Sequence, residues 1–210
     1  LPGCDAVKGR IDVWIAEDAI EFAKQFGSES PITEWAAGVA FPREGRIILR
    51  AYGTALFSLL QTFDHEVSHI LVHRTVGGRR LPRWFLEGLA IWQASESLAD
   101  HVQQAVGASL SDRLMPFQQL TRGFPVSGTA VRVAYAQSAL FVRWLVREHG
   151  EESLRRVLGR VRQGDDFNTA FVGVYRRPLD EAVRLWTESL EEAATPWYLL
   201  RDGTVFWVLM

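Results

Sequence analysis

The sequence predicts an α+β domain, with a small sheet near the N-terminal end and helices through the rest of the chain. Short alternating apolar runs are confined to about the first fifty residues, as expected for strands. After Gly53 the apolar residues follow helical spacing, roughly over 54–75, 83–97, 131–149, 151–163 and 178–194. Since 210 residues with 48% hydrophobic content can bury one substantial core, we expect a single domain over 1–210.

The sheet-rich part, 1–53, is predicted to hold three strands and one helix. Ile11–Ile15 alternates as a strand, and Ala19–Phe26 has helical spacing. Two further strands, Gly38–Phe41 and Ile47–Ala51, flank the turn Pro42–Gly45. Because so short a turn joins neighbouring strands, we expect an antiparallel hairpin within a small mixed sheet.

The remaining chain divides into a pair of helices in 54–97, a helical part in 98–196 and an apolar tail in 197–210. The stretch 107–130, rich in glycine and proline, is predicted to be a long loop. The last seven residues, Thr204–Met210, are too few to span a bilayer, which takes about twenty. Either the tail packs as a strand or helix, or it begins a membrane segment that continues after Met210.

Composition narrows the classes of partner. The net charge is only −2, which gives no global field for nucleic acid or an anionic membrane surface. The single cysteine, Cys4, cannot form an internal disulfide. The chain opens with Leu1 and carries no basic stretch followed by an apolar run, so the sequence assigns it no compartment. We therefore expect partners to be selected locally, at a site.

The segment from Asp64 to His69 contains the pattern HExxH. Two histidines four residues apart on a helix, here His65 and His69, project from one face and can bind one zinc ion. Apolar residues gather on the opposite face, which predicts a buried back for this helix: Leu56, Leu60, Phe63, Val67, Ile70 and Leu71. A lone histidine pair would more often be ordinary polar residues, but Glu66 stands where hydrolysis needs a base.

A catalytic zinc site takes three protein ligands and keeps one position open, so a third ligand is needed. Glu87 is the candidate, because the loop 77–82 between it and His69 allows a second helix to run antiparallel to the first. The small residues Gly88 and Ala90 follow it, where two helices must approach closely around a metal. The alternative makes Glu87 a solvated acid on a helix surface.

His65 to His69, followed by Trp84-x-x-Glu87-Gly88-x-Ala90, resembles the gluzincins, particularly the aminopeptidase N group and its bacterial relatives called peptidase MA-like domains. The resemblance implies a zincin-like fold and a zinc-dependent peptidase acting on a peptide or protein. It further implies that Zn²⁺ is held by His65, His69 and Glu87, while Glu66 deprotonates the attacking water and passes the proton to the leaving amine.

Two departures from that family affect the expected specificity. Leu86 replaces an asparagine that usually precedes the third ligand, and the interval before that ligand is slightly shorter. The stretch Trp35–Phe41 carries no carboxylate that could hold a substrate amine, so aminopeptidase specificity is not predicted. Its backbone could still pair with an extended peptide, a mode that requires no particular side chain.

Other residues near these motifs allow two interpretations each. The resemblance implies that a downstream tyrosine, here Tyr135, stabilises the oxyanion, although aromatic residues on helices usually serve packing. His73 continues the face of His65 and His69 and could line a cleft or be a polar surface residue. The arginines of the loop 79–83 are interpreted as solvated and receive no role.

Two rival functions differ in class from a peptidase. One is a catalytically silent descendant of this fold that serves as a binding or scaffold module; the complete set of His65, Glu66, His69 and Glu87 argues against it. The other is a di-iron helical bundle, which needs two Glu-x-x-His motifs. Only Glu66-x-x-His69 occurs in the chain.

Overall fold

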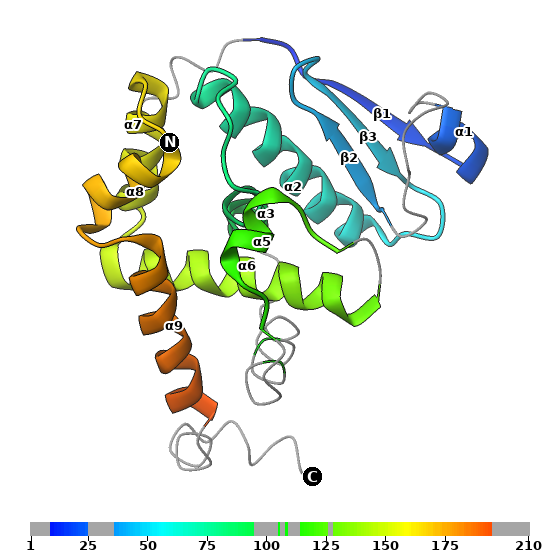
Figure 1. Cartoon of the computed structure of the whole chain (residues 1–210). Helices are drawn as coiled ribbons and strands as arrows, with labels where there is room; N and C mark the ends of the chain where they lie inside the picture. Colours follow the sequence, from blue (N-terminus) through cyan, green and yellow to red (C-terminus); the bar gives the residue numbers. More distant parts are fainter. Residues whose placement is uncertain are drawn as a thin grey trace.

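The computed structural model describes residues 9–24, 36–94, 105, 108, 114–125 and 128–194. A three-stranded sheet comes first, and the rest of the described chain is helical (Figure 1). The first part holds β1 (Asp12–Ala16), α1 (Ala19–Lys24), β2 (Gly38–Phe41) and β3 (Arg46–Arg50). The helices that follow are α2 (Leu56–Thr75), α3 (Arg83–Gln93), α5 (Phe117–Arg122), α6 (Gly128–His149), α7 (Glu152–Gln163), α8 (Phe167–Tyr175) and α9 (Leu179–Ala194).

The sheet has the strand order β1-β3-β2, with β1 parallel and β2 antiparallel to the central β3. The predicted mixed sheet and hairpin are confirmed, and each strand lies within one residue of its predicted bounds. Gly45 closes the hairpin at a φ of +67°, a conformation that side chains with a Cβ rarely adopt. Ile47, Ile48 and Leu49 of β3 are buried, because the strand is flanked on both edges. β2 is left as one edge of the sheet.

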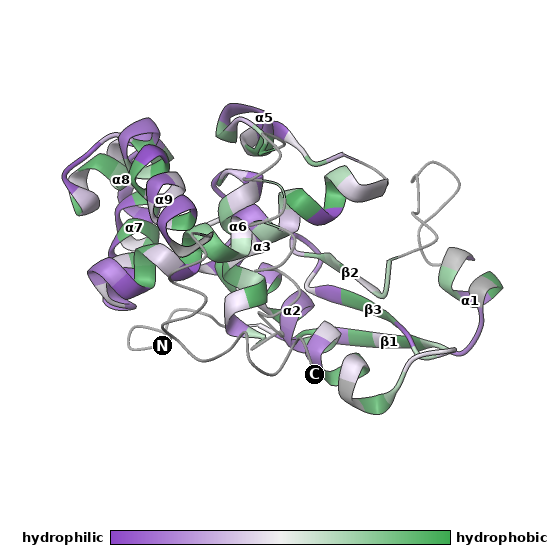
Figure 2. Ribbon diagram, turned by 90° about the horizontal axis from the view of Figure 1, so that it is seen from below, coloured by the Kyte–Doolittle hydropathy of each residue, from purple (hydrophilic) through white to green (hydrophobic). Residues whose placement is uncertain are grey.

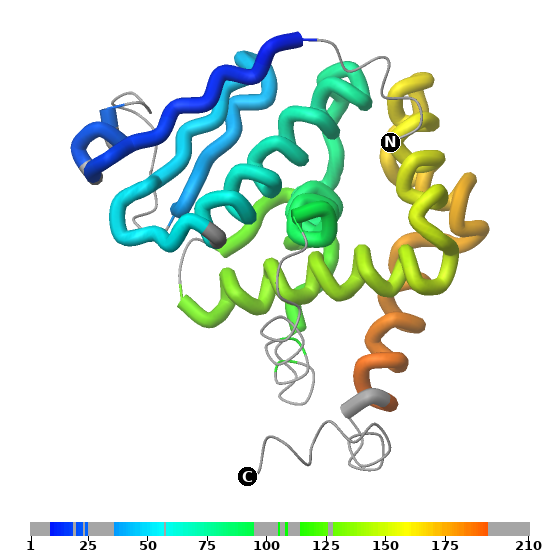
Figure 3. The backbone as a smooth tube through the Cα atoms, turned by 180° about the vertical axis from the view of Figure 1, so that it is seen from behind, coloured from blue at the N-terminus to red at the C-terminus, as the bar shows by residue number. Residues whose placement is uncertain are grey.

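Helix α2 lies between the sheet and the other helices (Figures 1 and 3). Its contact with the sheet is an apolar cluster that includes Leu59, Phe63, Val67 and Ile70 of the helix. The predicted buried back is therefore confirmed for the middle of the helix.

The same prediction is wrong for Leu56 and Leu60, which are 72% and 53% exposed. Neither residue belongs to the cluster that joins α2 to the sheet. Leu59, whose side chain points about 100° away from that of Leu60, makes the contact instead.

The helical part is built around aromatic residues. Trp84 is fully buried and contacts Phe85, Phe117, Phe141 and Phe167, whose ring centroids lie 5.1–5.7 Å from its own. These rings come from α3, α5, α6 and α8, so one tryptophan joins four helices. Figure 2, coloured by hydropathy, shows apolar and polar residues mixed along α7, and Leu154, Val157, Leu158 and Val161 are among its buried residues. The start of α3 is therefore fixed in the core of the helical part.

Helix α3 packs closely against α6 at Gly88. A Cβ at this position would lie 2.3 Å from the carbonyl oxygen of Ser138 and 2.7 Å from Cγ2 of Val142. Any side chain at residue 88 would therefore push the two helices apart. The sequence predicts that the small residues after Glu87 lie where two helices approach around a metal; Gly88 instead marks the contact of α3 with α6.

Two short helices, α5 and α8, were not predicted, and the long helix α6 begins at Gly128, three residues earlier than predicted. Helix α5 lies inside the stretch predicted to be a loop. Helix α8 was missed, because its β-branched and aromatic residues obscure the helical spacing. Its start does carry a signal, since the Asp166 carboxylate accepts a hydrogen bond from the Thr169 amide at 3.1 Å.

Some predictions concern parts of the chain outside the described residues. These are Cys4, the predicted helix ends at 25–26 and 95–97, residues 107, 109–113 and 126–127 of the predicted loop, and the apolar tail 197–210. Among the residues that the structure does describe, no helix combines the length and apolar character needed to cross a membrane.

Candidate metal centre

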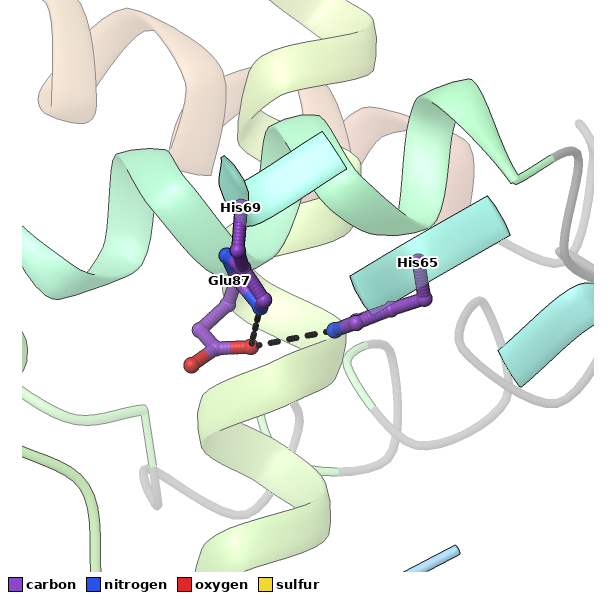
Figure 4. A group of neighbouring side chains, drawn as sticks. All are labelled: His65, His69 and Glu87. Atoms are coloured by element: carbon purple, nitrogen blue, oxygen red, sulfur yellow. Dashed lines mark ion pairs between the residues drawn. The ribbon is translucent and has the colours of Figure 1, made fainter. Parts of the chain in front are cut away.

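Three candidate ligands meet between α2 and α3. His65 and His69 project from one face of α2, and Glu87 reaches toward both imidazoles from α3 (Figure 4). One nitrogen or oxygen of each residue lies within 4.8 Å of the others. The helical spacing of four residues brings the two rings together, with centroids 4.9 Å apart. Helix α3, which contacts α2, supplies the carboxylate.

The distances suit a small divalent ion. Glu87 Oε2 lies 3.4 Å from His65 Nε2 and 3.6 Å from His69 Nε2. Donors held about 2.0–2.1 Å from a tetrahedral zinc are separated by about 3.3 Å, so small movements would place all three around one ion. Two imidazoles and one carboxylate are also a donor set that catalytic zinc uses.

Electrostatics keeps Glu87 ionised although only 7% of the residue is exposed. Burial by itself would raise its pKa, but the favourable interactions of the carboxylate with the His65 and His69 imidazoles outweigh that effect and lower it. Arg83, one helical turn earlier on α3, lies 3.3 Å from the second carboxylate oxygen, Oε1. The carboxylate is thereby oriented with Oε2 toward the imidazoles.

Glu66 is buried beside this cluster, with 8% of the residue exposed. Burial raises its pKa above the ordinary value, against the opposing effect of the His69 and His65 imidazoles. The backbone N–H of Ala40, in the edge strand β2, donates a hydrogen bond to its carboxylate. The strand approaches closely here, since a Cβ on Gly38 would lie 3.1 Å from Glu66 Cγ.

Tyr135 of α6 lines the same cleft and is only partly buried. Its hydroxyl interacts with Arg83 through a hydrogen bond, and its ring contacts Phe124 at 5.0 Å. Burial raises the pKa of the hydroxyl, and the nearby charge of Glu87 adds to that effect. The group therefore remains protonated and can donate a hydrogen bond at neutral pH.

Two polar contacts hold the elements around the site. The Ser68 hydroxyl donates to the Gln93 side-chain oxygen at 2.6 Å and joins α2 to the end of α3. On α6, the amide of Gln137 bonds both backbone groups of Met115, at 2.8 and 3.1 Å. This second contact fixes the segment that leads into α5, and no sequence pattern predicts it.

The side chains of His65, Glu66, His69 and Glu87 line a cleft of about 1740 Å³. Residues 36–44, which include β2, form one wall, and α2 lies at the floor with His73 farther along it. The loop 78–83, the end of α5, the first turns of α6 and the start of α8 contribute the remaining lining. No sequence pattern links the loop 79–83 with another segment of the cleft. The structure places Arg43, Arg122 and Arg132 around the same cleft.

Comparison with known proteins gives one match. A family model described as the peptidase MA superfamily matches residues 4–192, which is most of the chain. No curated protein and no solved structure matches the chain.

Proposed function

The chain belongs to the peptidase MA superfamily, and we propose that it is a zinc-dependent peptidase that hydrolyses peptide bonds with Glu66 as general base. The observation that carries the proposal is the convergence of His65, His69 and Glu87 at one point of a cleft. Superfamily membership and this cluster together suggest a metallopeptidase. Our proposal goes further in two respects: it names zinc as the metal, and it assigns a role to each residue of the site.

His65, His69 and Glu87 would hold the ion through Nε2 of each imidazole and Oε2 of the carboxylate. A bound zinc ion supplies Lewis acidity, which makes water more acidic and a peptide carbonyl more electrophilic. Arg83 holds the other carboxylate oxygen of Glu87, and such contacts behind a ligand set its orientation. Four side chains on two adjacent helices would thus define the centre.

The remaining steps use the chain's own groups. An extended peptide can pair with the edge strand β2, whose residues 38–41 line the cleft. Glu66 takes a proton from the attacking water and delivers it to the amine that leaves when the C–N bond breaks. Tyr135 donates a hydrogen bond to the carbonyl oxygen as that oxygen gains negative charge.

We expect the purified protein to contain about one zinc ion per chain, because two imidazoles and one carboxylate form a three-ligand site. Elemental analysis of the wild type and of Glu87→Ala measures this directly, and the variant should lose most of its zinc. Equal, stoichiometric zinc in both proteins would remove Glu87 from the ligand set.

We expect Tyr135→Phe to lower kcat by about a hundredfold, in line with the loss of one oxyanion donor. KM, zinc content and thermal stability should change little, since the ring and its contact with Phe124 are kept. Kinetics on any peptide that the protein cleaves would provide the measurement. A kcat within a small factor of wild type would assign Tyr135 to packing.

The peptidase activity itself is tested by incubating the zinc-loaded protein with a diverse peptide pool and reading the products by mass spectrometry. Cleavage that disappears in Glu66→Gln would support the proposal. A protein that holds zinc and cleaves no peptide would instead be a silent binding or scaffold module.

A further inference from the structure

We propose that the cleft selects peptides with acidic side chains beside the scissile bond; this inference rests on the proposed peptidase function. Five exposed arginines, which we call the cleft arginines, line the cleft that also holds the metal centre. They are Arg43, Arg79, Arg80, Arg122 and Arg132. Their concentration contrasts with the chain as a whole, whose net charge is −2.

Four of the cleft arginines lie in the helical part of the chain. Arg79 and Arg80 come from the loop before α3, Arg122 ends α5, and Arg132 lies in the second turn of α6. Only Arg43 stands at the hairpin that closes β2. A peptide paired with β2 would have the metal centre beneath it and guanidinium groups around it. Alternate side chains of an extended peptide point the same way, so several could meet arginines together.

The cleft arginines have no acidic partner among the residues that the structure describes. Within the described ranges, none of the five forms an ion pair, whereas many arginines elsewhere do. Examples of paired residues are Arg10 with Asp12, Arg46 with Glu44, Arg160 with Asp165 and Arg184 with Glu188. The arginines around the cleft are therefore free to bind an acidic group that arrives from outside.

Two carboxylates also line the cleft away from the metal centre, and both already have partners. Glu44 pairs with Arg46 at 2.9 Å, and Asp166 accepts hydrogen bonds from the amide and hydroxyl of Thr169. Their negative charges offset part of the positive field. Five guanidinium groups against two carboxylates still leave the cleft walls positively charged.

The location of the arginines decides against a merely solvated loop. A solvated loop would account for Arg79 and Arg80, which are adjacent in sequence. It does not account for Arg43, Arg122 and Arg132, which come from three separate elements and reach the same cleft through the tertiary fold. Guanidinium groups suit such a site because each can donate paired hydrogen bonds to a carboxylate.

The test uses zinc-loaded Glu66→Gln protein and three fluorescent peptides of equal length, in which the same neutral centre is flanked by Glu, Gln or Lys. Binding is read by fluorescence anisotropy and requires no turnover. An exposed ion pair contributes a few tenths of a kcal/mol, so several pairs should make the Glu peptide bind about tenfold more tightly than the Gln peptide. Added salt should reduce the difference. Equal affinity for the Glu and Lys peptides would overturn the proposal.

A matched pair of charge reversals locates the effect. Arg132 and Arg143 are both exposed arginines on α6, and only Arg132 lines the cleft. Eleven residues apart on a helix, they point within about 20° of each other. Arg132→Glu should weaken binding of the Glu peptide about fivefold, while Arg143→Glu should stay within about twofold of the parent. Equal losses in both variants would indicate a general field and would contradict a cleft effect.

The two proposals can fail separately. If peptides bind according to charge and none is cleaved by the wild type, acidic recognition stands and the peptidase function falls. If peptides are cleaved without regard to charge, the peptidase function stands and this inference falls. Circular dichroism checks the fold of each variant, and a glutamate near the start of α6 is compatible with the helix dipole.

Discussion

Glu66→Gln should reduce peptide hydrolysis by about 10²–10⁴-fold while the protein keeps its zinc. The amide has the size of the carboxylate and can still accept the hydrogen bond from the Ala40 backbone N–H. It lacks the basic oxygen that takes a proton from water, and general base catalysis contributes a factor of this order. Turnover on a cleaved peptide and zinc content by elemental analysis should be measured on the same preparation.

The retention of zinc is the control for this experiment, because Glu66 is assigned to proton transfer and not to metal binding. His65, His69 and Glu87 converge without it. A variant that loses both zinc and activity would show that Glu66 is needed for the metal centre itself. A variant that keeps its full rate would exclude it as the base.

Gly88→Ala should destabilise the protein by about 1–3 kcal/mol, the range seen when a close-packed interior is overfilled. The added methyl group would lie 2.3 Å from a backbone oxygen of Ser138, and a backbone atom cannot turn aside as a side chain can. The two helices must therefore separate, which would also shift Glu87, the neighbouring residue on α3. Chemical denaturation and a zinc competition assay would detect the two effects.

Gly159→Ala is the matched control, because Gly159 lies in helix α7 and a Cβ there would meet nothing within 4 Å. Alanine is favoured over glycine in a helix interior, so this variant should gain up to about 1 kcal/mol. The same substitution would then have opposite signs at two helical positions. A neutral effect at Gly88 would show that α3 and α6 can separate without cost.

The geometry of an α-helix explains why the meeting of His65 and His69 in the candidate metal centre could be predicted from the sequence. Residues four apart on a helix share a face, so HExxH places His65 and His69 together before any tertiary contact is known. A loop followed by a second helical pattern predicts the antiparallel return that carries Glu87. Glu87 meets the imidazoles as expected, and no fold information beyond these two helices was needed.

The cleft walls could not be predicted in the same way. Arg122 lies in a stretch that the sequence predicts to be a loop, and Arg43 lies in a hairpin turn. Neither position has a pattern that points toward the metal centre. Their meeting depends on how α5 and the sheet pack around α2, which local periodicity does not encode. The contact of Gly88 with α6 was undetermined for the same reason, since small residues indicate a close approach but not its partner.

The proposed metal centre and the walls of the cleft come from different parts of the sequence, so one can change while the other is kept. The polar side chains of the proposed metal centre, from His65 to Glu87, fall within 23 consecutive positions that also include Glu66 and Arg83, while the walls come from residues 36–44, 121–122, 128–132 and 166–168 as well as the loop 78–82. Substitutions in those outer segments could retarget the protein to other peptides without disturbing hydrolysis. A library that varies the walls and keeps residues 65–69, 83, 87 and 135 constant would therefore be a practical starting point for engineering new cleavage preferences.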